Sequence, residues 1–229
     1  ICLRVNPDVD AKTHEKISTG RSEDKFGISD KKVFEIFKKF ESNKFIKIKG
    51  LSMHSGSQIV LLEPFNKAFK KIKLQILKLK KEGFEVSSLD LGGGVGIKYN
   101  DKNKILDIRS YAQVIDELFS DLDLEIIIEP GRYLVGSSGI ILSRVIRTKS
   151  GDNKDFVIID AGMDNLIRPA LYGAEHKIIP VKKKKQTNLK SYDIVGPICE
   201  SSDVFIKKMK IHRLNSDDLV VICSTGAYS

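Results

Sequence analysis

The sequence predicts an α/β fold, a partial (β/α)8 barrel of the TIM type followed by a mostly antiparallel β domain. Over the first part of the chain, apolar strand-like runs alternate with amphipathic helical stretches, which is the pattern of parallel βαβ units. The strand ends recur at a nearly constant distance: His54 and Gly92 are 38 residues apart, and Gly92 and Glu129 are 37 apart. Further along, short strands follow one another with turns between them, which is typical of an antiparallel sheet. We therefore expect two domains, residues 1–138 and 139–229.

The expected first domain runs in the order strand 1–6, helix 29–42, strand 45–53, helix 64–82, strand 86–91, helix 105–120 and strand 124–128. Helix 64–82 has the clearest pattern, because its apolar residues recur at helical spacing and lysines fill the opposite side. Pro64 stands near its first turn and Gly83 just past its end, where these two residues are favoured. For the preceding helix, Ser29 or Asp30 is the expected N-cap.

The last strand of this domain ends in an unusual way. Ile126–Ile128 are three apolar β-branched residues in a row, which predicts the buried end of a strand. Glu129 follows, and then Pro130-Gly131 turns the chain out of the sheet. A buried carboxylate is costly without a cationic or hydrogen-bonding partner. That partner is either Arg132, in an ion pair that orders the loop, or a bound ligand.

Polar or glycine residues stand at the carboxyl ends of all four expected strands, at Asn6, His54, Gly92–Gly96 and Glu129. In a (β/α)8 barrel that rim is where active sites are assembled. Four units make only about half of an eight-stranded barrel. We expect the other half to lie upstream of Ile1.

The expected second domain is built from short strands, at residues 139–148, 155–161, 177–182, 192–195 and 219–223. No closing element follows the last of them, and we expect this domain to continue beyond Ser229.

Composition limits the classes of function. The net charge of +9 is compatible with binding nucleic acid, but the lysines do not stand among aromatic residues and many fall on the polar sides of helices. We expect Lys182–Lys185 to be an exposed loop or strand end. No apolar run of 18 residues exists, so no membrane span is predicted. There are three scattered cysteines, Cys2, Cys199 and Cys223. They are too few for a disulfide framework, so the reducing cytoplasm is the expected location.

Two motifs of the first domain are candidates for chemistry. Gly92–Gly96 follows a strand and precedes a helix, and it is either a phosphate cradle or a tight turn without a ligand. It does not match the dinucleotide fingerprint or a P-loop. His54 is either a structural histidine or a ring that stacks on a planar ligand, with Ser57 able to hydrogen-bond a phosphate. No second histidine or cysteine stands at a ligand spacing, so no metal site is predicted.

Two further motifs lie in the second domain. Arg168 and Tyr172 are four residues apart and share one face if the segment is helical, so they could clamp a carboxylate. Cys199 and Glu200 place a thiol beside a carboxylate in a tight turn. A buried cysteine is usually inert, so this motif alone does not indicate a function.

Ten segments, read together, resemble the diaminopimelate decarboxylase family, whose members are pyridoxal-phosphate enzymes with an alanine-racemase-like barrel and a β domain. Single motifs are shared with ornithine and arginine decarboxylases, whereas the Ser-Thr-Gly, Arg-Pro-Ala-Leu-Tyr-Gly and Cys-Glu segments together indicate diaminopimelate. The segments occur in the family's order, at Val5–Asp10, Ile17–Gly20, Lys25–Gly27, His54–Gln58, Asp90–Gly94, Glu129–Arg132, Asp160–Met163, Arg168–Gly173, Gly196–Glu200 and Gly226–Tyr228.

The resemblance implies a role for each candidate. Glu129 would pair with the pyridine nitrogen of pyridoxal 5'-phosphate and His54 would stack on its ring. The implied cofactor-binding set is His54, Ser57, Gly93, Gly94, Glu129, Pro130, Gly131, Arg132 and Tyr228. The implied substrate-binding set is Arg132, Arg168, Tyr172, Glu200 and Tyr228, with Glu200 on the distal ammonium group. Cys199 would return a proton to the α-carbon. Together with His54, which would stack on the cofactor ring, it forms the expected catalytic set.

The resemblance also implies a reaction and an assembly. The reaction is decarboxylation of meso-2,6-diaminopimelate to L-lysine, in a homodimer where Cys199 and Glu200 reach the neighbouring subunit's site. The alternatives are a related ornithine- or arginine-type decarboxylase and a non-catalytic decarboxylase-like binding protein. An anion-binding module for nucleic acid ranks below these, and no membrane partner is expected.

One departure from the family pattern is clear. The family forms a Schiff base through a lysine in a Tyr-Ala-x-Lys-Ala segment, and no such segment exists here. Lys98-Tyr99 stands in a different context. We therefore expect residues 1–229 to be inactive alone and the full-length parent to be active.

Overall fold

The computed structural model describes residues 1–9, 25–182 and 188–229. They form two compact units, one of Ile1–Ile97 with Lys104–Tyr133 and the other of Lys98–Asn103 with Leu134–Ser229. Expectations for Asp10, for Ile17–Gly20 and for Lys183–Lys185 lie outside the described residues.

The first unit contains a four-stranded sheet in the order β1-β2-β3-β4, and every neighbouring pair is parallel. The strands are β1 (Cys2–Val5), β2 (Gly50–Met53), β3 (Ser88–Asp90) and β4 (Glu125–Ile127), and the helices between them are α1 (Asp30–Phe40), α2 (Leu62–Lys81) and α3 (Ile108–Phe119). Cys2 pairs with Gly50, Gly50 with Ser88, and Ser88 with Glu125. The four strands therefore start at the same level, and their carboxyl ends share one edge of the sheet.

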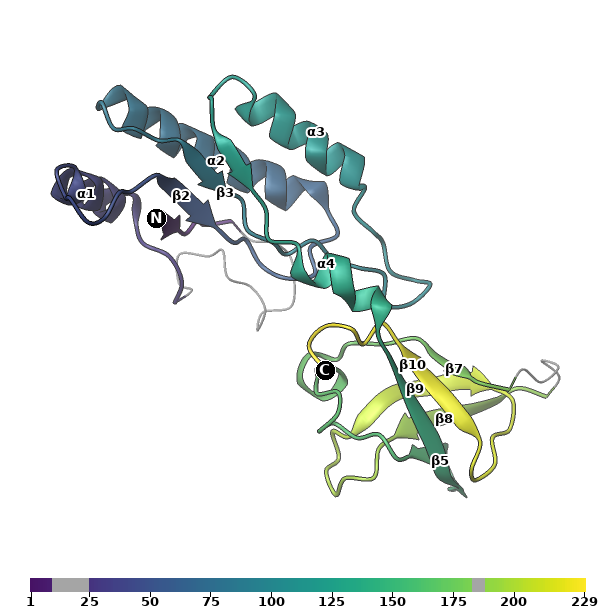
Figure 1. Ribbon diagram of the computed structural model, residues 1–229. Helices are drawn as coiled ribbons and strands as arrows, with labels where there is room; N and C mark the ends of the chain where they lie inside the picture. Colours follow the sequence, from purple (N-terminus) through teal and green to yellow (C-terminus); the bar gives the residue numbers. More distant parts are fainter. Residues whose placement is uncertain (10–24, 183–187) are drawn as a thin grey trace. The chain divides into compact units, whose positions relative to one another are not determined.

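The helices cover the sheet with their apolar faces, and α2 and α3 run side by side (Figure 1). Phe65 and Phe69 of α2 are fully buried, which stabilises the fold by about 1.5–3 kcal/mol for each side chain. Their rings lie 5.0 and 5.8 Å from the ring of Tyr111 in α3. Burial raises the pKa of Tyr111 to about 12. Gly83 follows α2 with a φ of +88°, as expected for the residue after a helix.

Two expectations about the strands are wrong. Ile127 and Ile128 are 38% and 49% exposed rather than buried, because β4 is the edge strand of the described sheet and pairs with β3 alone. The second strand begins at Gly50 rather than at residue 45. Phe45 is 96% exposed, since the side chain of Asn43 accepts hydrogen bonds from the backbone N–H groups of Phe45 and Ile46 and holds a turn there.

The second unit contains a six-stranded sheet in the order β7-β10-β5-β6-β8-β9. Its strands are β5 (Ile140–Ser150), β6 (Asp155–Ile159), β7 (Ile178–Pro180), β8 (Lys190–Val195), β9 (Val204–Ile211) and β10 (Leu219–Cys223). Among these described strands only β6 and β8 pair in parallel. The predicted fold class is confirmed: a parallel α/β part is followed by a mostly antiparallel β part.

Four elements were not predicted, namely strand β9, helices α4 (Gly131–Val135) and α5 (Arg168–Tyr172), and the short 3-10 helix η2 (Gly136–Ser138). In β9 the lysines at 207, 208 and 210 hide the apolar pattern, and Lys208 has a φ of +55° that interrupts the alternation. Strand β9 nevertheless carries buried Phe205 and Ile211 into the core of this sheet.

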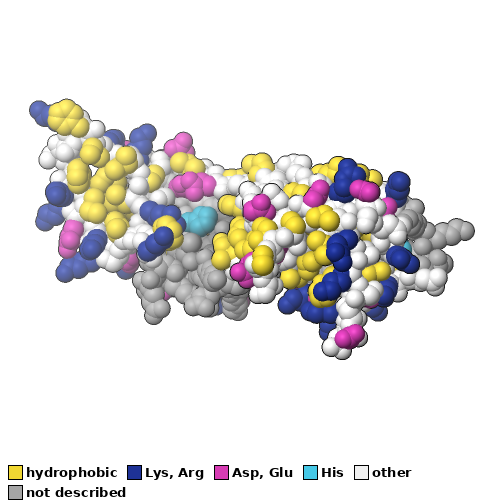
Figure 2. Space-filling model, turned by 90° about the horizontal axis from the view of Figure 1, so that it is seen from below, with side chains coloured by type: hydrophobic (Ala, Val, Ile, Leu, Met, Phe, Trp, Pro, Cys, Tyr) yellow, Lys and Arg dark blue, Asp and Glu magenta, His cyan; other side chains and the backbone are white. Residues whose placement is uncertain are grey.

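On the face that Figure 2 shows, lysine and arginine side chains are scattered, and acidic and apolar side chains lie between them. Among the described residues, no helix combines the length and the apolar character needed to span a bilayer.

Candidate active site

The loops after β2, β3 and β4 meet at the shared edge of the first unit's sheet. His54 follows β2, the glycines at 92–94 follow β3, and Glu129 follows β4. The backbone N–H of Gly93 donates to Nδ1 of His54 at 3.3 Å. The N–H of Glu129 donates to the carbonyl oxygen of Gly92 at 2.8 Å. The structure therefore brings the histidine, the triple glycine and the glutamate together.

The triple glycine is required by how closely these loops approach one another. A β-carbon on Gly93 would lie 2.1 Å from the carbonyl oxygen of Glu129, and one on Gly94 would lie 2.1 Å from that of Gly56. Gly94 also has a φ of +97°, a conformation that other residues rarely adopt. The N–H of Gly92 is bound by the carboxylate of Asp90 at 2.8 Å. The glycines thus form a tight backbone junction between the loops.

His54 is partly buried at this junction. Burial lowers its pKa, and the positive charge of Arg4 lowers it further, while Asp90 opposes the shift. The imidazole is therefore neutral at pH 7. A neutral imidazole, held at its Nδ1 edge by the N–H of Gly93, is suited to contact a flat, charged ligand.

The segment after His54 contains two residues that sequence reasoning missed. The side chain of Gln58 binds both backbone groups of Ile97, donating to the carbonyl oxygen at 2.6 Å and accepting from the N–H at 3.2 Å. This pair ties the loop after β2 to the loop after β3. The hydroxyl of Ser55 is buried and has no hydrogen-bond partner among the described residues. The predicted Ser57 is partly buried in the same loop.

The burial of Glu129 and Arg132 differs from what the sequence predicted. Glu129 is exposed, so the argument from a buried carboxylate does not apply to it. Arg132 lies in α4 and is only 8% exposed. Pro130-Gly131 between them form the turn, in which the N–H of Gly131 donates to the carbonyl oxygen of Glu129 at 2.9 Å. The exposed carboxylate at the end of β4 is accessible to a ligand.

In the second unit, Arg168 and Tyr172 are the first and last residues of α5, so the segment is helical as their clamp interpretation required. Arg168 is 4% exposed. Its guanidinium carbon lies 4.4 Å from the ring centroid of Tyr99, and Nη1 lies 3.1 Å from Nε2 of His176. Sequence reasoning missed Tyr99 and His176 as neighbours of this arginine, because no local motif contains the three residues.

Cys199 and Glu200 are exposed in a loop between β8 and β9. This loop is organised by Asp203, which is 3% exposed and was not predicted. Its carboxylate accepts from the N–H of Ile198 at 2.9 Å and from the N–H of Met163 at 2.8 Å. A β-carbon at position 196 would lie 2.3 Å from the same carboxylate, which explains the glycine there.

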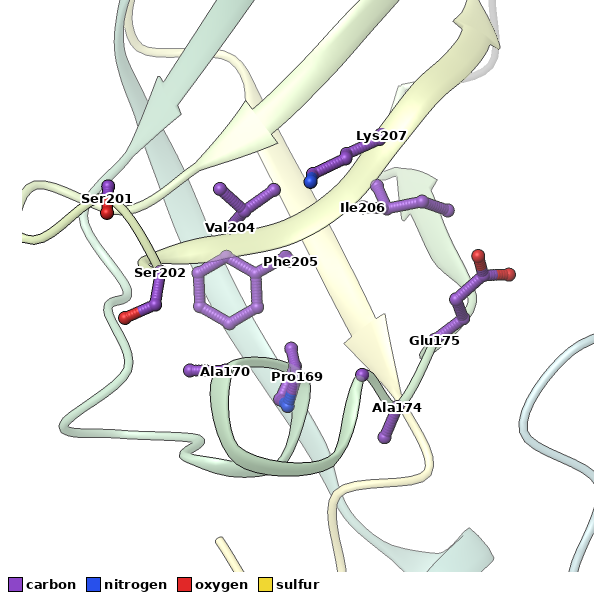
Figure 3. Close-up of a pocket in the computed structure, with 11 residues that line it drawn as sticks. Pro169, Ala170, Ala174, Glu175, Ser201, Ser202, Val204, Phe205, Ile206 and Lys207 are labelled. Carbon is purple, nitrogen blue, oxygen red and sulfur yellow. The ribbon is translucent and has the colours of Figure 1, made fainter. Parts of the chain in front are cut away.

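Tyr228, the last candidate, is 60% exposed with a φ of +62°. The second unit also has a cavity of about 380 Å³ beside α5 and β9, where the ring of Phe205 lies next to Pro169 and Ala170 (Figure 3). The predicted residues Arg168 and Glu200 do not line this cavity.

The candidates therefore fall into two groups, each organised within its own unit. The first unit holds His54, Ser57, Gly93, Gly94, Glu129, Pro130, Gly131 and Arg132, and the second holds Arg168, Tyr172, Cys199, Glu200 and Tyr228.

Known proteins match the chain over its whole length. A diaminopimelate decarboxylase from Zymomonas mobilis subsp. mobilis is 41% identical over 229 residues, which are 100% of this chain and 54% of that protein. One from Neisseria meningitidis serogroup A is 44% identical over 228 residues, 100% of this chain and 55% of the relative. The crystal structure of diaminopimelate decarboxylase from Helicobacter pylori complexed with L-lysine is 39% identical with a TM-score of 0.93, covering 99% of this chain and 56% of that one.

The chain spans about half the length of the curated relatives it matches. Residues 1–136 match the family described as pyridoxal-dependent decarboxylase, pyridoxal binding domain. This match covers the parallel sheet and all three of the loops that meet at its edge. The chain belongs to the pyridoxal-dependent decarboxylase family.

Proposed function

We propose that this chain is part of a pyridoxal-phosphate-dependent carboxy-lyase that converts meso-2,6-diaminopimelate to L-lysine and carbon dioxide, the last step of lysine biosynthesis. The observation that carries the proposal is the identity of 41% and 44% over the whole chain to two diaminopimelate decarboxylases. The Helicobacter pylori relative was crystallised with L-lysine, which is the product of this reaction.

The residues of the first unit suit the cofactor. The exposed carboxylate of Glu129 offers a partner for a protonated ring nitrogen, and the neutral ring of His54 can stack on a cationic ring without charge repulsion. The buried hydroxyl of Ser55 has no hydrogen-bond partner among the described residues, so it is available to a polar group of a bound ligand. We assign the phosphate to Ser57, Gly93, Gly94, the backbone of Gly131 and Arg132, and Tyr228, and Pro130 to the turn that carries Gly131 and Arg132.

The cofactor, when bound, supplies a ring that accepts the electron pair left by the departing carbon dioxide. Glu129 would keep the proton on the ring nitrogen, because a carboxylate stabilises a neighbouring positive charge. His54 would hold the ring in one orientation from its face. Cys199 would then donate a proton from its sulfur to the carbon that carried the carboxyl group.

Substrate recognition would depend on charge at both ends of the molecule. We assign the substrate carboxylates to Arg132, Arg168 and Tyr172, since guanidinium and phenol groups form charge-assisted hydrogen bonds with carboxylates. Glu200 would bind the distal ammonium group, and Tyr228 would also contact the substrate. A substrate lacking the distal ammonium or the second carboxylate would leave one of these charges unpaired.

The proposal includes an assembly and a domain division. We propose a cytoplasmic homodimer in which the Cys199–Glu200 loop serves the neighbouring subunit's site. We propose that residues 1–138 are the C-terminal half of the barrel and residues 139–229 the β domain. The separation of compact units near Tyr133 and Leu134 supports this division. The cofactor-attaching lysine expected in a Tyr-Ala-x-Lys-Ala segment is not within residues 1–229.

The test is a substrate panel. The complete gene product that includes residues 1–229 is incubated with pyridoxal 5'-phosphate and, separately, with meso-diaminopimelate, ornithine, arginine and lysine, and the released carbon dioxide is measured. The proposal expects turnover of diaminopimelate well above the others, and none from residues 1–229 alone. Preference for ornithine or arginine would support the related-decarboxylase alternative instead, and no turnover at all would support a binding protein.

A further inference from the structure

We propose that His176 is a positioning residue that holds the guanidinium of Arg168 in the orientation needed to bind a substrate carboxylate. The inference rests on the function proposed above for Arg168 and adds a residue to it. His176 is not part of any motif that carries the family resemblance.

The first observation is the geometry around His176. The side chain is 1% exposed. Its Nε2 lies 3.1 Å from Nη1 of Arg168, and its Nδ1 lies 2.9 Å from the carbonyl oxygen of Cys223. The imidazole thus links the first residue of α5 to the last residue of β10.

The partners fix which ring nitrogen carries the proton. The carbonyl oxygen of Cys223 can only accept a hydrogen bond, so Nδ1 of His176 must donate. The guanidinium of Arg168 can only donate, so Nε2 must be unprotonated and accept. His176 is therefore the neutral Nδ1–H form, and it presents a single acceptor to the arginine.

The second observation is that the ring of Tyr99 packs against both the imidazole of His176 and the guanidinium of Arg168. The ring centroid of Tyr99 lies 4.6 Å from that of His176, and the same tyrosine ring lies 4.4 Å from the guanidinium carbon of Arg168. The backbone of Lys177 donates to the carbonyl of Tyr99 at 3.0 Å and accepts from the N–H of Cys223 at 2.8 Å. The guanidinium of Arg168 thus contacts the ring of Tyr99 with its face and donates a hydrogen bond from Nη1 to His176.

This arrangement restricts a side chain that is otherwise flexible. A free arginine loses rotamer entropy when it binds a ligand, and a guanidinium that is already oriented loses less. Removing the acceptor at Nε2 would leave Arg168 charged and buried but less well oriented. The loss would appear mainly as weaker substrate binding.

The test uses the complete gene product with pyridoxal 5'-phosphate. His176→Phe keeps a ring against Tyr99 but removes both nitrogens, and His176→Gln restores an acceptor. His212→Gln is the matched control, because His212 is also a buried histidine of the second unit. We expect His176→Phe to raise KM for diaminopimelate about tenfold, the factor that corresponds to losing one hydrogen bond to a charged group. His176→Gln should recover part of the loss, and His212→Gln should leave KM unchanged.

A second kinetic comparison separates positioning from a general structural role. In an Arg168→Ala background, His176→Phe should add no further loss, because the residue acts through the arginine. Wild-type KM in His176→Phe, or an additive loss in the Arg168→Ala background, would overturn the inference. Thermal unfolding of each variant identifies any that does not fold, and His176→Gln then carries the comparison.

A readout that needs no activity is the 15N spectrum of histidine-labelled protein, with the His176 signals assigned by their loss in His176→Gln. The inference expects a protonated Nδ1 and an unprotonated Nε2. A protonated Nε2 would overturn the arrangement whatever the activity. Failure of the wild type to decarboxylate diaminopimelate would instead overturn the proposed function, and with it the substrate that we assign to Arg168.

Discussion

The backbones of Gly93 and Glu129 are packed so closely that a β-carbon on Gly93 would lie 2.1 Å from the carbonyl oxygen of Glu129. The contact joins the loop after β3 to the loop after β4. The position of the glutamate therefore depends on the glycine having no side chain. Stability and cofactor binding are expected to change together when this contact is disturbed.

Gly93→Ala is expected to lower the free energy of unfolding by about 2–4 kcal/mol, because backbone atoms must move to admit the methyl group. Pyridoxal 5'-phosphate binding should weaken in the same variant. Gly83→Ala is the control, since a β-carbon there would have no described atom within 4 Å and only the φ of +88° is unfavourable, at a cost of about 1 kcal/mol. Urea denaturation measures the free energy of unfolding of both variants. An equal loss of stability in Gly93→Ala and Gly83→Ala would contradict the packing argument.

The depressed pKa of His54 predicts a specific pH dependence. Its ordinary pKa is 6.5, and burial lowers it in the folded protein, so the unfolded chain binds the proton more tightly. The free energy of unfolding should therefore rise with pH between the folded pKa and 6.5, and fall as the pH drops through that interval. Denaturation of the wild type and of His54→Asn from about pH 5 to 8 checks this. If the variant keeps the wild-type dependence, His54 is not its source.

Asp203 is predicted to support the Cys199–Glu200 loop. Asp203→Ala removes the acceptor of two partly buried backbone N–H groups, those of Ile198 and Met163. We expect it to lower the free energy of unfolding by about 1–3 kcal/mol. The exposed Asp152 provides a control, for which alanine should change stability by no more than about 0.5 kcal/mol.

Activity gives a second readout for the same pair of variants. Asp203→Ala should lower kcat for diaminopimelate, because the proposed proton donor Cys199 would no longer be held in one position. Wild-type kcat in a folded Asp203→Ala protein would show that the loop does not need this carboxylate.

The parallel unit could be predicted from the sequence because its elements have strong local patterns. The apolar stripe of α2, the flanking Pro64 and Gly83, and the apolar strand runs are all local features. Local pattern also predicted that residues at successive strand ends would share one edge of a sheet, as His54, Gly92 and Glu129 do.

The parts that were not predicted depend on residues far apart in the sequence. The exposure of Ile127 and Ile128 follows from the edge position of β4, which the strand's own residues do not encode. Asp203 forms a hydrogen bond with Met163, 40 positions away, and His176 forms one with Cys223, 47 positions away. Neither polar residue belongs to a motif, so only the folded structure identifies its role.

The most direct test of the account is the effect of Glu129→Gln on decarboxylation of meso-diaminopimelate by the complete gene product loaded with pyridoxal 5'-phosphate. The amide has nearly the same shape as the carboxylate but lacks the negative charge that would hold the proton on the ring nitrogen. We expect kcat to fall at least about 100-fold, as when a group that stabilises charge in the transition state is removed. A Glu129→Gln enzyme that binds the cofactor and retains the wild-type kcat would contradict the central claim.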